Sequence, residues 1–393
     1  MFERHAGNDR AVLVQLAFGK ASLADDLEEL QSLAASAGAD TTAVVTGRRE
    51  RPDSALYAGK GKVEEIGAAC VEQSAELVIF NHSLSGAQER NLEKALSCRV
   101  IDRRTLILDI FAQRARSAEG KLAVELAQLE HLSTRLVRGW SHLERQRGGV
   151  GMRGPGEKQL EIDRSLITVR IRALKERLQK VDRQRQTQRR QRERSQTRSI
   201  AIVGYTNAGK STLFNKLTAA GSYAANQLFA TLDTTVRKLY VADAQPLVVS
   251  DTVGFVRALP HELVDAFKAT LLEAVEADLL LHVVDGASDQ RDQQIEAVNI
   301  VLEEIGAADI PQLIVVNKCD LLGLGTDAGR VEPDDMGLAR RVFVSAKTGA
   351  GIPELRAALQ ARFPRQNSYP NVTIDPGDGH DTATAWLPSP SAA

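Results

Sequence analysis

Residues 204–211 read Gly204-Tyr205-Thr206-Asn207-Ala208-Gly209-Lys210-Ser211, a complete G-x-x-x-x-G-K-S pattern. A β-branched, apolar run precedes it and the helix-like STLFNKL follows, which is the context that a phosphate-binding loop requires. The glycines let backbone N–H groups wrap phosphates, and the dipole of the following helix adds to the attraction. Lys210 would supply positive charge to the β- and γ-phosphates, and the Ser211 hydroxyl would ligate Mg²⁺. These eight residues are therefore predicted to bind a nucleotide.

A second motif, Asp251-Thr252-Val253-Gly254, directly follows the strand-like run PLVVS. A carboxylate at that strand end can hold magnesium through water, and the Gly254 N–H can meet the γ-phosphate. Because Asp and Gly also favour ordinary turns, the motif taken alone leaves a structural turn open.

Two further motifs predict a guanine pocket. Asn317-Lys318-Cys319-Asp320 closes the apolar run QLIVV, and Ser345-Ala346-Lys347 follows VFV. Asp320 can accept hydrogen bonds from the guanine N1–H and 2-amino group, which adenine does not offer in that arrangement. A site built on such paired contacts rejects the wrong base because its buried polar groups would stay unsatisfied. The four motifs, in this order, resemble the nucleotide-binding boxes of translation-factor-type GTPases.

The segment between the first two motifs is expected to be a switch that responds to the γ-phosphate. It runs Phe229-Ala230-Thr231-Leu232-Asp233, followed by two more threonines. Thr231 is favoured as the second Mg²⁺ ligand because the sequence resembles the A-T-L-D form of Obg-like GTPases. Thr234 and Thr235 remain alternatives.

Two residues depart from the pattern of Ras-type GTPases. Phe255 stands where a water-positioning glutamine would be, and its side chain cannot orient a nucleophilic water. Hydrolysis should therefore be slow, or should need help in trans or from a cation. Asn207 matches the asparagine that coordinates K⁺ in some GTPases without this glutamine, although a turn-favouring Asn is an equally good interpretation.

Outward from these motifs, apolar runs alternate with helical segments over residues 199–365. This predicts a P-loop GTPase domain with a doubly wound sheet. The strands are expected at Ile200–Val203, Leu239–Ala242, Leu247–Ser250, Leu279–Val284, Gln312–Val316 and Val342–Val344. Residues 1–104 also alternate strand and helix patterns, which predicts an N-terminal parallel α/β domain.

Residues 105–198 have a different pattern, which predicts a helical hairpin of coiled-coil type. One apolar face is marked by leucines from Leu122 to Leu136, and another runs from Ile167 to Val181 with 3–4 spacing. Between them, Arg145–Glu157 is rich in Gly and Arg and is expected to form the hairpin tip. After Val181 the second helix is polar and basic, which suits either a solvated connector or contact with a polyanion.

Three segments together resemble the HflX family of ribosome-associated GTPases. They are Tyr57–Ile66 (YAGKGKVEEI), Val100–Leu132, and the Gly- and Arg-rich stretch that contains GVGMRGPGE. The resemblance covers roughly residues 13–364 and implies the same three-part architecture. It also implies binding to the large ribosomal subunit, through rRNA and proteins, with a role in ribosome dissociation, rescue or biogenesis. Arginine that neutralises phosphate and exposed glycine backbone are compatible with an RNA partner.

Composition sets the remaining expectations. The formal net charge of -1 hides a basic middle and an acidic tail, residues 366–393, whose Pro, Gly, Ser and Asp content predicts disorder. Three separated cysteines without a C-x-x-C pair indicate reduced thiols. No signal peptide or membrane-spanning run is evident, so a cytoplasmic monomer without membrane contact is expected. Gly59-Lys60-Gly61-Lys62 could contact RNA or a second nucleotide, but it lacks the rest of a P-loop.

The leading hypothesis is a GTPase with GTP as substrate, Mg²⁺ as cofactor and K⁺ as a possible activator. The alternative is a ribosome- or RNA-binding protein that holds GTP as a structural ligand and turns it over little. Phe255 keeps this alternative open, whereas Asp320 conflicts with a P-loop ATPase.

Overall fold

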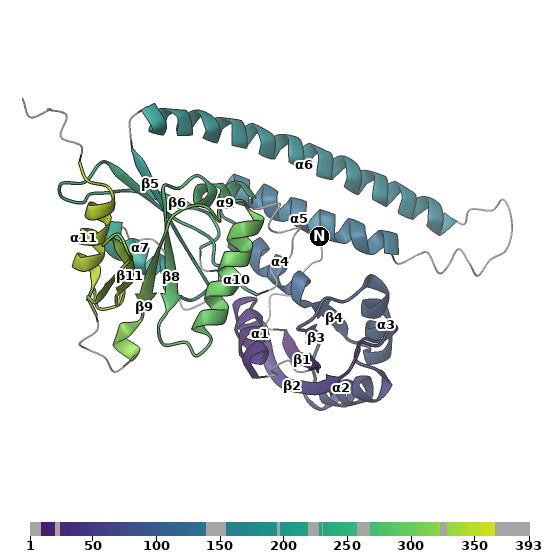
Figure 1. Cartoon of the computed structure of the whole chain (residues 1–393). Helices are drawn as coiled ribbons and strands as arrows, with labels where there is room; N and C mark the ends of the chain where they lie inside the picture. Colours follow the sequence, from purple (N-terminus) through teal and green to yellow (C-terminus); the bar gives the residue numbers. More distant parts are fainter. Residues whose placement is uncertain are drawn as a thin grey trace, which may run out of the picture.

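The computed structural model describes residues 9–19, 24–138, 155–194, 197–218, 228–229, 231–257, 268–322 and 328–365. Ala230, the predicted hairpin tip up to Gly154 and the tail 366–393 lie outside these ranges. Figure 1 shows two α/β units side by side, with a long helix above both. The predicted α/β fold class, with its parallel N-terminal sheet and helical hairpin, is confirmed.

The N-terminal unit is a four-stranded parallel sheet in the order β2-β1-β3-β4. The central strand β1 is almost wholly buried, as expected where helices cover both faces of a parallel sheet. The helix α3 begins with a capping box in which Ser85 and Gln88 satisfy each other's backbone N–H groups. The bounds are β1 Arg10–Phe18, α1 Ala24–Ser36, β2 Asp40–Arg49, α2 Lys60–Glu72, β3 Leu77–Phe80, α3 Gly86–Leu96 and β4 Arg99–Asp102.

The helical region consists of α4 (Arg103–Arg114), α5 (Ala118–Arg138) and α6 (Pro155–Arg194). The sequence pattern did not separate α4 from α5. In the structure α4 ends at Arg114, because the next residue, Ala115, has an extended backbone with φ -60° and ψ 114°. The predicted apolar seam is confirmed: Leu174 of α6 is fully buried against the neighbouring helix α5. Ion pairs from Arg170 and Lys175 to glutamates of α5 also join the two helices.

The GTPase-type unit is a seven-stranded sheet in the order β10-β11-β9-β8-β5-β7-β6. The five central strands are parallel, and the two edge strands β6 and β10 are antiparallel to their neighbours. Helices lie on both faces of this sheet (Figure 1). The bounds are β5 Arg198–Gly204, α7 Lys210–Thr218, β6 Thr235–Leu239, β7 Leu247–Asp251, α9 Lys268–Val275, β8 Leu279–Asp285, α10 Arg291–Glu304, β9 Gln312–Asn317, β10 Val331–Pro333, β11 Ala339–Phe343 and α11 Ile352–Arg362.

In this unit one predicted strand has the wrong bounds and one strand was not predicted. A strand was expected at Leu239–Ala242, but the observed edge strand β6 spans Thr235–Leu239. It ends at Leu239 because its antiparallel pairing with β7 ends there. The edge strand β10 had no apolar pattern to reveal it, since both Val331 and Pro333 are exposed.

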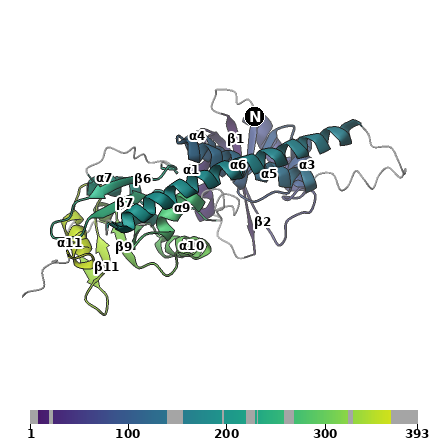
Figure 2. The same cartoon turned by 90° about the horizontal axis from the view of Figure 1, so that it is seen from above.

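One hydrophobic cluster joins the two units and the helical region. It includes Leu13 and Phe111 from the N-terminal half and Val203, Phe229 and Phe255 from the GTPase-type unit. The rings of Phe111 and Phe229 meet edge to face with centroids 4.6 Å apart. Figure 2 shows α6 lying across the top of both units. No described helix is long and apolar enough to cross a membrane, and all three cysteines are free thiols.

Candidate nucleotide site

The loop between β5 and α7 has a backbone that its glycines make possible. Gly204 and Gly209 adopt φ values of 147° and 93°. A Cβ on Gly204 would lie 2.2 Å from the Val283 carbonyl oxygen, and one on Gly209 would lie 2.2 Å from Nδ2 of Asn317. Only glycine fits both positions, so the loop can approach the Val283 carbonyl group and the Asn317 side chain closely.

Lys210 is the first residue of α7 and is 7% exposed. Its ammonium group donates a hydrogen bond to the Tyr205 carbonyl oxygen at 2.8 Å, which folds the side chain back over the loop. Burial lowers the Lys210 pKa to about 8, and the Asp251 carboxylate opposes that shift. A buried cation with one neutral partner is a strong attractor for an anion.

Three oxygen-bearing side chains gather beside Lys210. The Ser211 and Thr231 hydroxyl oxygens lie 2.7 Å apart, and Thr231 donates to Oδ2 of Asp251 at 3.1 Å. Burial raises the Asp251 pKa, against hydrogen bonds from Ser211 and Thr231 and the charge of Lys210. The other carboxylate oxygen, Oδ1, is buried and has no partner in the described part of the chain. This hard-oxygen cluster suits Mg²⁺.

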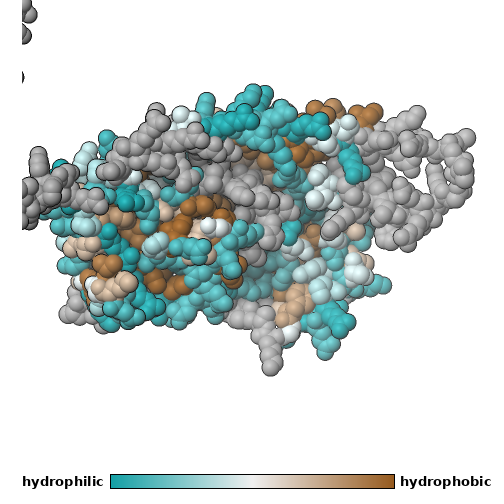
Figure 3. Space-filling view, turned by 45° about the horizontal axis from the view of Figure 1, so that its top comes forward, coloured by the Kyte–Doolittle hydropathy of each residue, from teal (hydrophilic) through white to brown (hydrophobic). Residues whose placement is uncertain are grey.

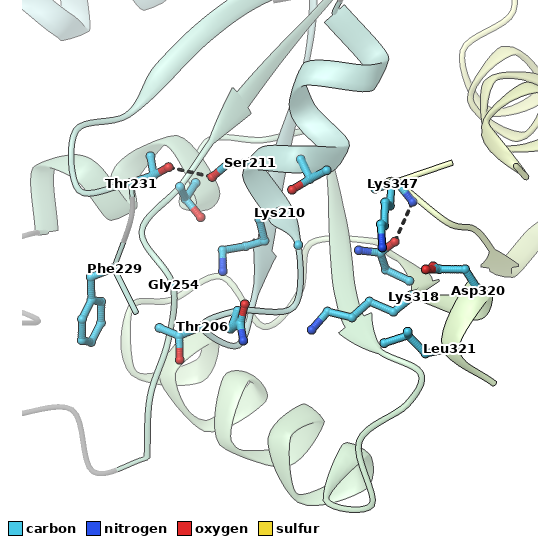
Figure 4. Close-up of a pocket in the computed structure, with 16 residues that line it drawn as sticks. Thr206, Lys210, Ser211, Phe229, Thr231, Gly254, Lys318, Asp320, Leu321 and Lys347 are labelled. Carbon is cyan, nitrogen blue, oxygen red and sulfur yellow. Dashed lines mark hydrogen bonds between the residues drawn. The ribbon is translucent and has the colours of Figure 1, made fainter. Parts of the chain in front are cut away.

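Lys210, Ser211 and Thr231 border a cavity of about 310 Å³ that runs from the phosphate loop to β9 and the loop after β11. Figure 4 shows Lys210, Ser211, Thr231 and Gly254 at one end, with Asp320, Leu321 and Lys347 at the other. The lining consists of Thr206, Asn207, Gly209, Lys210, Ser211, Thr212, Phe229, Thr231, Thr252, Gly254, Asn317, Lys318, Asp320, Leu321, Ala346 and Lys347.

Asn317 holds the two ends of the cavity together. Its side-chain amide donates to the Ala208 carbonyl oxygen at 2.8 Å and accepts from the Ala346 N–H at 2.9 Å. The phosphate loop and the loop after β11 are thereby tied to one side chain at the end of β9. Asn317 thereby positions both loops while it lines the cavity, and its direct contact with a base stays a prediction.

The far end of the cavity presents a carboxylate and two lysines. Ser345 donates to Oδ1 of Asp320 at 2.7 Å, which fixes the carboxylate and leaves its other oxygen available for a ligand. Lys318 has a left-handed backbone, with φ 64°, and its ammonium group lies 2.7 Å from Asp285. Its stem therefore runs along the cavity wall.

Several predicted residues stand behind the cavity instead of lining it. Gly204, Tyr205, Ala208, Leu232, Asp233, Asp251, Val253 and Ser345 are absent from the lining. Asp251 and Ser345 act through hydrogen bonds to residues that do line it. Thr212 and Leu321 line the cavity but were not predicted. Each directly follows a motif residue, and only that adjacency could have indicated them.

Among the threonines of the first switch, Thr231 is the one beside Ser211 and Asp251, whereas Thr235 begins strand β6. The Phe255 side chain is fully buried, and its backbone pairs with the phosphate loop at Tyr205. It therefore points away from the cavity, as its apolar character predicts. Asn207 lines the cavity with a left-handed φ of 61°, which satisfies the turn interpretation and leaves K⁺ binding a prediction.

The first switch reaches out of the cavity and contacts the N-terminal half. Its Asp233 carboxylate accepts from the backbone N–H groups of Arg116 and Ser117 at 2.9 and 2.8 Å, at the start of α5. The Leu228 N–H donates to the Ser36 hydroxyl of α1 at 3.1 Å. Thr231 therefore faces the cavity, whereas Leu228 before it and Asp233 after it are hydrogen-bonded to the N-terminal unit and to the start of α5.

A second connection starts from the phosphate loop and the segment after Gly254. The Tyr205 hydroxyl is hydrogen-bonded to Glu29 of α1 and accepts from the Arg257 N–H at 2.9 Å. Burial, followed by the Glu29 charge, raises the Tyr205 pKa. Buried Arg103 pairs with Glu29 at 2.9 Å and donates to the Arg257 carbonyl oxygen at 3.1 Å. Both walls of the phosphate end thus contact α1 and α4.

Three sequence families match this chain in succession. Residues 24–112 match the family described as GTP-binding GTPase N-terminal, and residues 114–192 match GTP-binding GTPase Middle Region. Residues 199–318 match the family described as 50S ribosome-binding GTPase.

Curated relatives match nearly the whole chain. The GTPase HflX of Escherichia coli is 52% identical over 96% of this chain and 88% of its own length. The GTPase HflX of Caldanaerobacter subterraneus is 46% identical over 92% of this chain and 82% of its own length. Among solved structures, the crystal structure of SsGBP with GDP has a TM-score of 0.50 and 23% identity, covering 90% of this chain and 98% of that one. That likeness supports the fold.

Proposed function

The chain belongs to the HflX family of GTPases, and from this we propose that its nucleotide state controls engagement with the large ribosomal subunit. The chain is a GTP hydrolase, since its relatives are GTPases that match it over almost its full length. Dissociation, rescue or biogenesis of ribosomes is the proposed context. We propose a cytoplasmic monomer with domains at 1–104, 105–198 and 199–365, followed by the tail.

The cavity is the proposed GTP site, with the triphosphate at the Lys210 end and guanine at the Asp320 end. The buried Lys210 ammonium group and the N-terminus of α7, which begins at that residue, suit phosphates. The free oxygen of Asp320 suits the guanine N1–H and 2-amino groups, and Lys318 and Lys347 would cover the ring. The remaining predicted residues, such as Ala208 and Val253, would support this site from behind.

Ser211 and Thr231 are the proposed Mg²⁺ ligands, with Asp251 acting through water. The support is their mutual hydrogen bonding and the unpartnered, buried Oδ1 of Asp251. When bound, the ion would neutralise charge that develops on the phosphates during hydrolysis. As a ligand, Thr231 would thus gain a further tie to the site, in addition to the hydrogen bonds that it makes with Ser211 and Asp251.

The observation that carries the proposal is that neighbouring residues of the first switch contact two different places, the nucleotide site and the helical region. Thr231 faces the nucleotide end, whereas Phe229 packs on Phe111 of α4 and Asp233 holds the start of α5. Loss of the γ-phosphate would release Thr231, and the same short segment would then loosen its grip on the helical region. Nucleotide state and hairpin position are thereby linked through about five residues of chain.

The helical region offers a surface for the ribosomal partner. Arginines and lysines recur along the sequence of α6. Near the N-terminal end of this helix, the side chains of Ile162, Leu166 and Val169 are 53%, 62% and 64% exposed. Figure 3 shows this apolar surface beside the hydrophilic stretch of the helix. The description of the matching family as 50S ribosome-binding GTPase supports the choice of the large subunit. The predicted Arg145, Arg147 and Arg153 contacts lie outside the described residues.

Co-sedimentation with separated ribosomal subunits, in a GTP analogue and in GDP, tests the proposal. We expect binding to the large subunit with the analogue and weaker binding with GDP. Equal binding in both nucleotides, or none to the large subunit, would contradict it. Phosphate release with and without large subunits, measured in parallel, tests the alternative of a binding protein with little turnover, which the buried Phe255 favours. That alternative predicts no stimulation.

A further inference from the structure

Thr206, the third residue of the phosphate loop, has a hydroxyl group that the structure leaves unused. The residue lines the cavity and is only 7% exposed. Its Oγ1 is buried and has no hydrogen-bond partner among residues that the structure describes. A hydroxyl removed from water without a partner costs free energy, so a hydroxyl of this kind that lines a ligand cavity points to an acceptor on the ligand.

The Thr206 backbone is fixed, so only its side chain can respond to a ligand. Its N–H donates to the Phe255 carbonyl oxygen at 2.7 Å, and the Phe255 N–H donates to the Gly204 carbonyl oxygen at 3.2 Å. These two bonds clamp the loop to the segment after Gly254. Rotation about the Cα–Cβ bond by about 120° can move the hydroxyl into the staggered position that the methyl group occupies.

The methyl position lies at the phosphate end of the cavity. A Cβ built on Gly254 would lie 2.7 Å from Thr206 Cγ2 and 3.0 Å from the Lys210 ammonium nitrogen, so both flank the same point. Figure 4 shows Thr206, Gly254 and Lys210 together at this end, far from Asp320. A hydroxyl in that position would stand beside the lysine and against the glycine whose N–H is expected to meet the γ-phosphate.

We propose that the Thr206 hydroxyl donates a hydrogen bond to the γ-phosphate of GTP and so distinguishes GTP from GDP. The assignment rests on the proposed nucleotide site. Phosphate oxygens supply the acceptor that Thr206 lacks, and a bond to a charged acceptor is stronger than a neutral one. Phe255 adds no polar side chain on this wall, which leaves Thr206 to supply the contact.

Removal of the hydroxyl at constant shape tests the inference. Thr206→Val is nearly isosteric, and Thr206→Ser retains the hydroxyl without the methyl. Thr218→Val is a matched control, because that hydroxyl donates to the Phe214 carbonyl oxygen at 2.7 Å and lies further along α7. The affinities for GDP and for a non-hydrolysable GTP analogue are measured by titration for each protein. Thermal melting checks the fold, and Thr206→Ala replaces the valine variant if the latter does not fold.

We expect Thr206→Val to weaken binding of the analogue about tenfold or more while its GDP affinity stays within about twofold of wild type. Thr206→Ser and Thr218→Val should bind both nucleotides like the wild type. Unchanged analogue binding by Thr206→Val would overturn the inference, and so would equal losses for GDP and analogue. Loss of all guanine-nucleotide binding by the wild-type protein would instead refute the proposed site itself.

Discussion

The Asp233 carboxylate of the first switch accepts the Ser117 backbone N–H at 2.8 Å, and Ser117 in turn caps α5 by accepting the Gly120 N–H at 2.8 Å. The sequence separation between Asp233 and Ser117 is 116 residues. An acidic group at a helix start is stabilising because it satisfies free N–H groups and complements the helix dipole. Asp233 lies two residues after Thr231, so this stabilisation of α5 depends on the position of the first switch.

Asp233→Ala should therefore uncouple the hairpin from the nucleotide. We expect GTP affinity to stay near wild type and the free energy of unfolding to fall by about 1 kcal/mol. The difference in large-subunit binding between the GTP analogue and GDP should become smaller. Asp309→Ala, at an exposed loop position, is the control. Co-sedimentation in both nucleotides measures the effect, and a full nucleotide response in Asp233→Ala would exclude this route of coupling.

Asp320→Asn should change the base preference. The amide NH₂ can donate to the 2-carbonyl group of xanthine, whereas the side chain no longer has two acceptor oxygens for the guanine N1–H and 2-amino groups. We expect weaker GTP binding and improved binding of xanthosine nucleotides, measured by competition with a fluorescent nucleotide. If GTP is still preferred over ATP as strongly as in wild type, Asp320 does not read the base.

Lys210→Ala and Ser211→Ala should separate the charge of the phosphate end from its metal. Loss of the buried ammonium group should lower GTP affinity by at least about tenfold, because a charge-assisted contact is removed. The serine variant should instead respond less to added Mg²⁺ in both binding and hydrolysis. Titrations with and without Mg²⁺ distinguish the two, and wild-type affinities in both variants would refute the assignment of the loop.

The buried imidazole of His282 makes stability depend on pH. Burial lowers its pKa to about 4, while its Nδ1 lies 3.1 Å from Gln312. The unfolded chain protonates this group near its ordinary pKa of about 6.5. Between these values the unfolded state binds more protons, so the free energy of unfolding should fall with decreasing pH, by up to about 1.4 kcal/mol per unit. We would measure the free energy of unfolding with urea from pH 7.5 to 4.5. Its dependence on pH should be weaker for His282→Gln than for the wild type, and equal dependence would disprove the role of His282.

Monovalent cations test Asn207. If its amide helps to hold K⁺ at the phosphate end, hydrolysis should be faster in KCl than in NaCl at equal ionic strength, and Asn207→Ala should abolish the difference. Phosphate release by the free protein is the measurement. Equal wild-type rates in the two salts would leave Asn207 with its left-handed turn alone.

The motifs of the GTPase unit were readable because their chemistry is local. Gly204 to Ser211 needs no distant partner to define a phosphate-binding loop, and apolar runs before Asp251 and Asn317 locate the strand ends. The parallel N-terminal sheet followed in the same way from alternating strand and helix patterns. Strand β10 escaped prediction because an exposed edge strand needs no apolar residues.

The sequence by itself therefore determined the fold class, the order of the parts and the nucleotide motifs, since these depend on spacing along the chain. Only the tertiary structure decided that Tyr205, Asp233 and Arg257 face the N-terminal half, and that Thr206 has an unused hydroxyl. Such pairings join residues more than a hundred positions apart, and many polar side chains could satisfy them equally well. Packing of the three parts around one shared core selects among them, which no local pattern records.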